Sequence, residues 1–228
     1  MILVDTVYQR VLALANKEQR GYVTPQEFNL LANQAQMEIF EQYFYDQKSE
    51  DRNLKNSTEF SNVDEMLDEK LSIFKNTQAL TVTGSIGTLP NNMYRLGSLF
   101  YASSLIEVEQ VTEEELMYLQ QSPLAKPSIY CPAFVRSGGN IVTLYPAPPT
   151  AINLNYIKTP AKVVWGYAVI NDKALYNNGS STNFELHSSD ETELVYKILS
   201  LAGIVIVKPG LGTYAEQQIT AQKTQEKQ

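Results

Sequence analysis

The chain has 228 residues, and its 18 basic and 25 acidic side chains give a formal net charge of −7. This charge argues against general binding to nucleic acid, because a protein needs a surplus of Lys and Arg to neutralise phosphates. Hydrophobic residues make up 43% of the sequence and charged residues 19%, which excludes global disorder. The single cysteine, Cys131, excludes an internal disulfide and a zinc site built from several thiolates.

The first third of the chain carries apolar residues at helical spacing. Thr24 and Glu27 form a capping box around Pro25, a strong signal for the start of a helix. The polar residues 47–61 lack periodicity and predict an exposed connection. Three helices are therefore predicted, over residues 4–16, 25–46 and 62–75.

The second predicted helix has two apolar stripes on nearly opposite faces, at about 100° of rotation per residue. One stripe consists of Phe28, Leu31, Ala32, Ala35, Ile39 and Tyr43. The other consists of Met37, Phe40 and Phe44. Two interpretations remain open: the helix is packed on both sides within its own domain, or one stripe meets a neighbouring subunit.

From residue 78 the chain changes to short β-branched and aromatic runs separated by Gly, Pro and Asn, which predicts an antiparallel β module. Strands are expected at 79–83, 94–101, 105–110, 129–136, 141–145, 152–158 and 163–170. Thr112 and Glu115 form a second capping box, which predicts a short helix ending before Ser122. Residues 171–186 are rich in turn formers and predict a loop or hairpin tip.

A long helix is predicted after the capping residues 188–191, and it is apolar nearly all round. Its most apolar stretch, 199–207, is about half the length needed to cross a bilayer, so we expect a buried helix and no membrane association. The amino terminus lacks a leading positive charge and an apolar core, so no secretory signal is expected.

The predicted fold class is α+β, with a helical bundle of N- and C-terminal helices and an inserted antiparallel β-sandwich or barrel-like module. The expected divisions are a helical part over 1–76, the β module over 77–186, and a C-terminal helix over 187–228. The last division ends in a polar tail that we expect a partner to order.

The candidates for catalysis are few. Cys131 and the only histidine, His187, could form a nucleophile pair, since imidazole can hold a thiolate at neutral pH. Their contexts favour a buried inert thiol in a strand and a histidine in local packing beside a helix cap. Glu107, Glu109 and residues 113–115 offer carboxylates, but acidic residues in a first helical turn are explained by the helix dipole.

The sequence carries no metal-binding His/Cys cluster, no GK[ST] phosphate loop and no GxGxxG motif. Asp64, Asp68 and Glu69 share a helical face, which is usually the solvated side of a helix. We therefore expect no cofactor and no enzymatic activity, and a protein that works through shape and contact.

The order of these features resembles the tubular adaptor proteins of short-tailed phages. The matching steps are a Leu-Pro followed by a polar pair and an aromatic strand, a strand leading into a small acidic helix, and a Tyr-Pro-x-Pro hairpin. The opening of the chain also resembles ring proteins of crAss-like phages and marine podoviruses. The segments concerned are Val4–Tyr43, Thr88–Arg95, Ile106–Leu116, Ser122–Pro127, Ile141–Pro148 and Ile152–Pro160.

The resemblance implies a structural virion protein at the head–tail junction, assembled in the host cytoplasm. Such a connector is a ring, typically dodecameric, that docks on the portal protein, extends the DNA channel and carries the next tail protein. No active site is carried over. An acidic lumen would repel phosphates and let DNA pass without specific binding.

A ring needs two different surfaces on each subunit. The residues expected at subunit or partner interfaces are Met37, Phe40, Phe44, Tyr45, Tyr214 and Ile219. Two alternatives remain: a ring or tail component at another level of the tail, and a small Cys/His hydrolase that uses Cys131 and His187.

Overall fold

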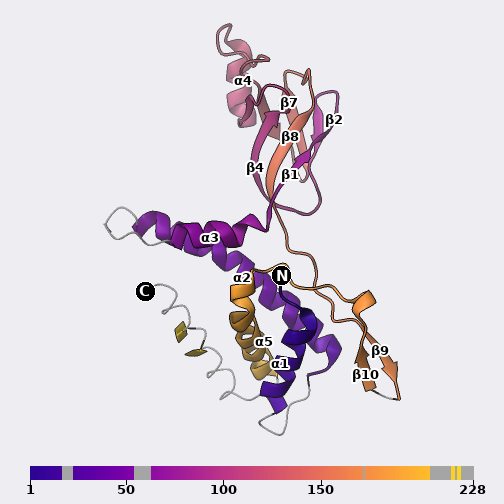
Figure 1. Cartoon of the computed structure of the whole chain (residues 1–228). Coiled ribbons are helices and arrows are strands. Elements are labelled where there is room, and N and C mark those ends of the chain that lie inside the picture. Colours follow the sequence, from indigo (N-terminus) through magenta and orange to yellow (C-terminus); the bar gives the residue numbers. More distant parts are fainter. Residues whose placement is uncertain (17–22, 54–62, 172, 206–216, 219, 222–228) are drawn as a thin grey trace. The chain divides into compact units, whose positions relative to one another are not determined.

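The computed structural model describes residues 1–16, 23–53, 63–171, 173–205, 217–218 and 220–221 (Figure 1). The chain forms two compact units, which are described separately. Unit 1 contains residues 1–73 and 160–228, and unit 2 contains residues 74–159. Unit 1 holds most of the helices and unit 2 holds an eight-stranded sheet, so the fold is mixed α and β.

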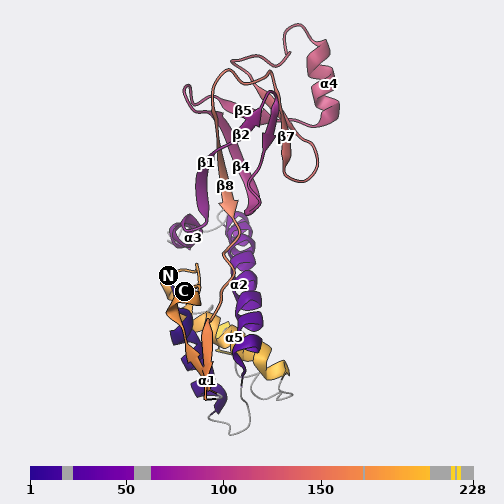
Figure 2. The same ribbon diagram turned by 90° about the vertical axis from the view of Figure 1, so that its right-hand side faces the viewer.

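The main helices of unit 1 are α1 (Val4–Asn16), α2 (Pro25–Asn53), α3 (Val63–Ser72) and α5 (Glu191–Val205). Both α1 and α2 contact α5, and α2 also contacts α3. Figure 2 shows α2 as a long helix beside α5. None of the helices in the described part of the chain has the length and apolarity that crossing a bilayer requires.

Helix α2 begins where the capping box predicts. The Glu27 amide donates to Thr24 Oγ1 at 3.3 Å, and the Thr24 amide donates to Glu27 Oε2 at 3.0 Å. The helix continues to Asn53, so the prediction that residues 47–53 belong to an exposed connection was wrong. This polar run contains neither Gly nor Pro, and polar residues alone do not end a helix. Residues 54–61 of that connection lie outside the described residues.

Both apolar stripes of α2 contribute buried residues. The buried members are Phe28, Ala32, Ala35, Ile39 and Tyr43 on one stripe and Phe40 on the other. The Phe40 and Phe44 rings meet edge to face, with centroids 5.1 Å apart. Helix α2 is therefore packed on two sides within the chain, the first of the two interpretations.

The sheet of unit 2 has the strand order β1-β8-β4-β5-β6-β7-β3-β2. Neighbours are antiparallel except for β5 and β6, which are parallel. The strands are β1 (Lys75–Ala79), β2 (Thr81–Thr83), β3 (Ile86–Thr88), β4 (Met93–Tyr101), β5 (Glu107–Gln110), β6 (Ala133–Arg136), β7 (Ile141–Tyr145) and β8 (Ile152–Lys158). The sequence missed β1 and β3, which are short and mostly exposed.

One apolar cluster forms the core of unit 2. Along β8, Ile152, Leu154 and Tyr156 are buried while the residues between them are not, as expected for alternating side chains. Helix α4 (Glu113–Gln121) follows the second capping box, and its Leu116 packs with Val111, Ala133 and Val135 in a smaller cluster. Figures 1 and 2 both show α4 at one end of unit 2.

Residues 160–186 belong to unit 1, although the predicted β module extended to residue 186. They contain a two-stranded hairpin of β9 (Tyr167–Ile170) and β10 (Lys173–Tyr176), followed by the 3-10 turn η1 (Asn178–Ser180). Strand β10 lies where the sequence predicted only a loop or hairpin tip. Only the second half of the predicted strand 163–170 is found as a strand, β9; its first half, residues 163–166, is an extended segment bound to α2.

Candidate assembly surfaces

Side-chain amides of α2 hold this extended segment in place. Asn33 pairs with both backbone groups of Val163, donating to its carbonyl at 2.8 Å and accepting from its amide at 2.9 Å. Asn29 pairs in the same way with Trp165, at 3.3 and 2.7 Å. Gln36 donates to the Ala161 carbonyl at 2.9 Å. We call this set the amide ladder; it satisfies backbone groups that a neighbouring strand would otherwise satisfy.

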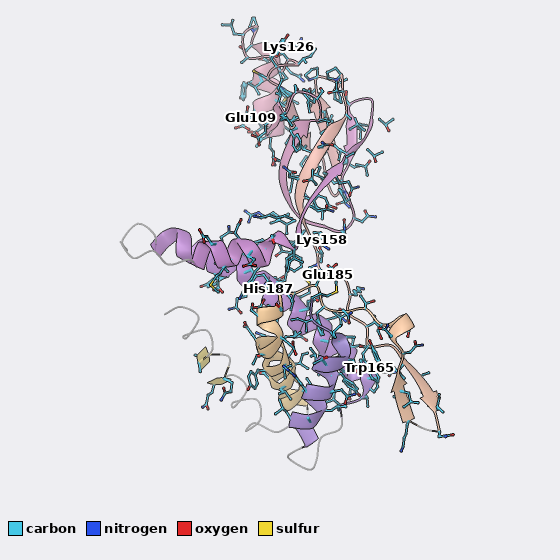
Figure 3. The ribbon with its side chains drawn as sticks, viewed as in Figure 1. Glu109, Lys126, Lys158, Trp165, Glu185 and His187 are labelled. Atoms are coloured by element: carbon cyan, nitrogen blue, oxygen red, sulfur yellow. The ribbon has the colours of Figure 1, made fainter. Side chains whose placement is uncertain are left out.

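Trp165 joins the amide ladder to the hairpin. Its ring is 2% exposed and lies 4.4 Å from the Tyr8 ring centroid. The Tyr167 and Tyr176 rings, one from each hairpin strand, lie at 5.8 Å on the same indole. The indole Nε1 donates to Asp5 Oδ1 at 3.0 Å. Figure 3 shows Trp165 between the helices and the hairpin, so the base of the hairpin is fixed to α1 and α2.

One face of the hairpin contacts Trp165 through Tyr167 and Tyr176, although Val169 on this face is 65% exposed, and the other face is exposed throughout. Tyr167 pairs with Tyr176 and Ala168 pairs with Leu175, so these two pairs point to opposite faces. The second face, here the outer hairpin face, consists of Ala168, Ile170, Lys173 and Leu175, all exposed. Ile170 is 54% exposed and Leu175 is 49% exposed. Apolar side chains on an exposed sheet face mark a contact surface.

A shallow groove lies between α1 and α5. It has a volume of about 300 Å³ and is lined by Arg10, Ala13, Leu14, Thr192, Val195 and Tyr196. Arg10 at its rim pairs with Glu191, with Nη1 and Oε1 2.8 Å apart. The groove is mainly apolar, so we call it the α1/α5 groove and count it as a second candidate surface.

The end of unit 2 that carries α4 exposes large apolar side chains. This unit 2 tip consists of Met117 and Tyr118 on α4 and of Leu124, Ile129 and Tyr130 in the following segment. Leu124 is fully exposed and Tyr130 is 82% exposed. Figure 3 labels Lys126 in this segment. The two core clusters of unit 2 do not include these residues, which leaves them available to a partner.

A buried polar cluster joins α2, α3 and the turn before α5. Asp190 is 1% exposed, and its carboxylate accepts a short hydrogen bond from Tyr43 Oη. Lys70 Nζ lies 2.8 Å from Asp190 Oδ1, and Ser189 Oγ donates to the same oxygen at 3.1 Å. The carboxylate has at least three partners, so the cluster links α2, α3 and the turn before α5 inside unit 1.

His187 caps the 3-10 turn η2 (Ser188–Asp190) that leads into α5. Its Nδ1 accepts from the Ser189 amide at 3.3 Å, and its Nε2 lies 3.9 Å from Glu69 Oε1. Its Nδ1 also lies 2.8 Å from Ser189 Oγ. The prediction that His187 serves local packing therefore agrees with its contacts.

Cys131 belongs to unit 2, whereas His187 belongs to unit 1. The predicted buried thiol in a strand was wrong, because Cys131 is exposed and precedes β6. Its amide and carbonyl pair with Ser128 at 3.2 Å in both directions, which forms a turn between two prolines. Pro132 has no amide to donate, but its carbonyl accepts from the Glu109 amide at 2.9 Å, and strand β6 begins at the next residue, Ala133.

Of the acidic candidates, Glu115 caps helix α4, whereas Glu107 and Glu109 lie in strand β5. Hydrogen bonds from the Thr112 amide and hydroxyl lower the pKa of Glu115, and those from Thr24 do the same for the pKa of Glu27. Glu113, Glu114 and Glu115 fill the first turn of α4. Among the described residues, no group of three or more His, Cys, Asp or Glu side chains is placed to hold a metal ion.

The predicted interface residues have different positions. Phe40 is buried in the chain, Met37 and Phe44 are half-buried, and Tyr45 is 75% exposed. Tyr214 and Ile219 lie outside the described residues, so their role stays a prediction. Sequence reasoning missed the outer hairpin face; the signal available was a pair of turn formers, Asn171 and Asp172, between the runs 167–170 and 173–176.

The sequence matches neither a protein-family model nor a curated protein.

Proposed function

We propose that the chain is a connector subunit of a short-tailed phage virion. In this function, copies form a ring at the head–tail junction, dock on the portal, extend the DNA channel and carry the next tail protein. The order of sequence motifs suggests this function, and the unit 2 tip is the observation that carries it.

The unit 2 tip supports a docking function because its side chains are large, apolar and exposed in a unit with a complete core. Exposed apolar patches on folded units mark contacts with other proteins. Tyr118 and Tyr130 belong to the residue class most often found at the centre of protein interfaces. The tip is therefore the proposed docking surface for the portal or for the next tail protein.

The contacts of α1 and α2 with α5 support the helical bundle expected for such a subunit. The net charge of −7, repeated around a ring, would give a negative channel. Such a channel disfavours tight contact with DNA phosphates, so DNA passes through without specific binding.

The test is the mass in solution of the purified protein, alone and mixed with its portal ring. We expect a shift to a complex whose subunit number matches the portal symmetry. Leu124→Asp combined with Tyr130→Asp should prevent binding at the unit 2 tip, whereas Leu30→Asp, 74% exposed on α2, should not.

If the wild-type protein does not bind the portal ring, the proposed position next to the portal is wrong. The alternative, a ring or tail component at another level, would then be identified by the tail protein that binds the unit 2 tip and by its stoichiometry.

A further inference from the structure

We propose that the unit 2 tip binds a different protein, one that presents basic side chains around an apolar centre. This inference rests on the docking function proposed for the tip and specifies the chemistry of the partner.

The acidic side chains of unit 2 are gathered in one short segment. Unit 2 contains five Asp or Glu residues, and all five lie within residues 107–115. All are exposed: Glu107 and Glu109 on β5, and Glu113, Glu114 and Glu115 at the start of α4. With these five glutamates against the single Lys126, residues 107–132 have a net charge of −4. The end of unit 2 that carries the tip is therefore acidic.

Helix α4 places acidic and apolar side chains on the same side. Residues four positions apart are neighbours on a helix surface. Glu113 therefore neighbours Met117, and Glu114 neighbours Tyr118, and all four are exposed. Leu116 lies on the other side of α4, in the smaller core cluster. The outer side of α4 presents carboxylates in its first turn and large apolar side chains in the next.

The segment after α4 belongs to the same surface. The Glu109 amide donates to the Pro132 carbonyl at 2.9 Å, so the chain that follows Tyr130 runs beside the acidic strand β5. Figure 3 shows Glu109 and Lys126 in the half of unit 2 that carries α4. Leu124 and Tyr130, the most exposed apolar residues of the tip, therefore have carboxylates as neighbours on one continuous surface.

Charge complementarity selects the occupant of this surface. Opposite charges across a contact guide two proteins together, and like charges suppress the wrong partner. Unit 2 has five acidic and five basic side chains, so the net charge of −7 belongs to unit 1. A second copy would meet the acidic tip with an acidic unit, and nucleic acid would meet it with phosphates. A different protein with Lys or Arg around apolar side chains fits both properties of the tip.

The test uses the full-length protein and two fluorescent peptides as probes. One is a helix-forming peptide of Leu and Lys, and the other has Glu in place of every Lys. Fluorescence anisotropy should show that the Leu/Lys peptide binds, that added salt weakens this binding, and that the Leu/Glu peptide does not bind. Equal binding of the two peptides would show that charge does not select the partner, and would overturn the inference.

Two variants locate the bound peptide. Glu113→Gln combined with Glu114→Gln keeps the cap at Glu115 and should weaken binding of the Leu/Lys peptide about two- to thirtyfold, as expected for the loss of two exposed ion pairs. Leu124→Ser combined with Tyr130→Ser keeps the charge and should weaken binding about tenfold or more, as for central apolar contacts. An unchanged circular dichroism spectrum shows that each variant keeps its fold.

The matched control removes two carboxylates from unit 1. Glu41 and Glu65 are exposed there, on α2 and α3. Glu41→Gln combined with Glu65→Gln should leave binding of the Leu/Lys peptide nearly unchanged. If this control weakened binding as much as the Glu113/Glu114 variant does, the peptide would follow the overall charge and the inference would be wrong.

The same variants, mixed with the portal ring and with the next tail protein, separate this inference from the proposed function. If the wild type and the Glu113/Glu114 variant join the assembly equally well at every salt concentration, the basic partner is wrong and the connector function stands. If the Leu/Lys peptide binds the tip as expected but the protein binds neither the portal nor the tail protein, the partner chemistry stands and the connector function is wrong. Failure of the Leu/Lys peptide to bind overturns the inference.

Discussion

Asp190 is an acidic side chain with almost no exposure to solvent, and it is held by Tyr43, Lys70 and Ser189. Removing one charge of a buried pair leaves the other in a poorly solvating environment. Asp190→Asn should therefore lower the free energy of unfolding by about 3–5 kcal/mol. Urea unfolding followed by the fluorescence of Trp165, the only tryptophan, reports on unit 1.

The matched control for Asp190 is a more exposed pair in the same unit. Arg10 is 54% exposed in its pair with Glu191. Glu191→Gln should cost less than Asp190→Asn, because the Arg10 side of this pair is exposed, although the Glu191 side chain is only 27% exposed. Equal losses in the two variants would contradict the assigned importance of burial.

Glu115 gives a prediction on pH. Its pKa is lowered from 4.5, first by the Thr112 amide and then by the Thr112 hydroxyl. A lowered pKa means that the carboxylate stabilises the folded cap above its ordinary pKa, and this stability is lost as the pH falls through the lowered pKa. The carboxyl carbon of Glu115, followed by NMR, should titrate with a midpoint below 4.5.

Thr112→Ala removes the hydroxyl and keeps the amide, so the Glu115 midpoint should rise part of the way to its ordinary value. Thr24→Ala breaks the equivalent capping box on α2 and should leave the Glu115 midpoint in place. If Thr112→Ala left the Glu115 midpoint unchanged, the Thr112 hydroxyl would contribute nothing to the lowering of the Glu115 pKa.

At the scale of elements, the amide ladder decides where the hairpin lies. Asn33→Ala removes both hydrogen bonds that the Asn33 side chain makes with the backbone of Val163, a fully buried residue. Each of the two unsatisfied buried backbone groups costs about 1–3 kcal/mol, so the free energy of unfolding should fall by about 2–6 kcal/mol. Urea unfolding followed by Trp165 fluorescence measures this loss.

Gln34→Ala changes the neighbouring amide, which is exposed and bonds only to Glu38 among the contacts described for it. This control should change the stability by less than about 0.5 kcal/mol. If Asn33→Ala were as mild, the amide ladder would not be what holds the 161–165 segment.

At the scale of the whole molecule, unit 2 is a continuous segment with its own core. Its ends meet, since Lys75 pairs with Ile157 and the Lys158 amide donates to the Phe74 carbonyl at 2.9 Å. A chain of residues 74–159 alone should therefore fold and show one cooperative thermal transition by circular dichroism.

Residues 1–73 alone should not fold in the same assay. They lack α5 and the 161–165 segment, which supply packing for α1 and α2 and partners for the amide ladder. A 74–159 chain without a cooperative transition would show that unit 2 depends on unit 1.

The sequence by itself determined the features that depend on near neighbours. The helix starts at Pro25 and Glu113 follow from capping residues three positions apart. The strands 141–145 and 152–158 follow from short β-branched and aromatic runs bounded by Gly, Pro and Asn. The two-sided burial of α2 was one of two interpretations, since periodicity shows which faces are apolar but not what covers them.

Only the tertiary structure decided the candidate surfaces. Asn33 and Val163 are 130 residues apart in sequence, and Tyr43 and Asp190 are 147 apart. No local pattern reveals that the amides of a helix replace a neighbouring strand for residues 161–165, or that residues 160–186 join unit 1. Such contacts form when distant segments are brought together by packing, and this packing places Tyr167 and Tyr176 of the hairpin on Trp165.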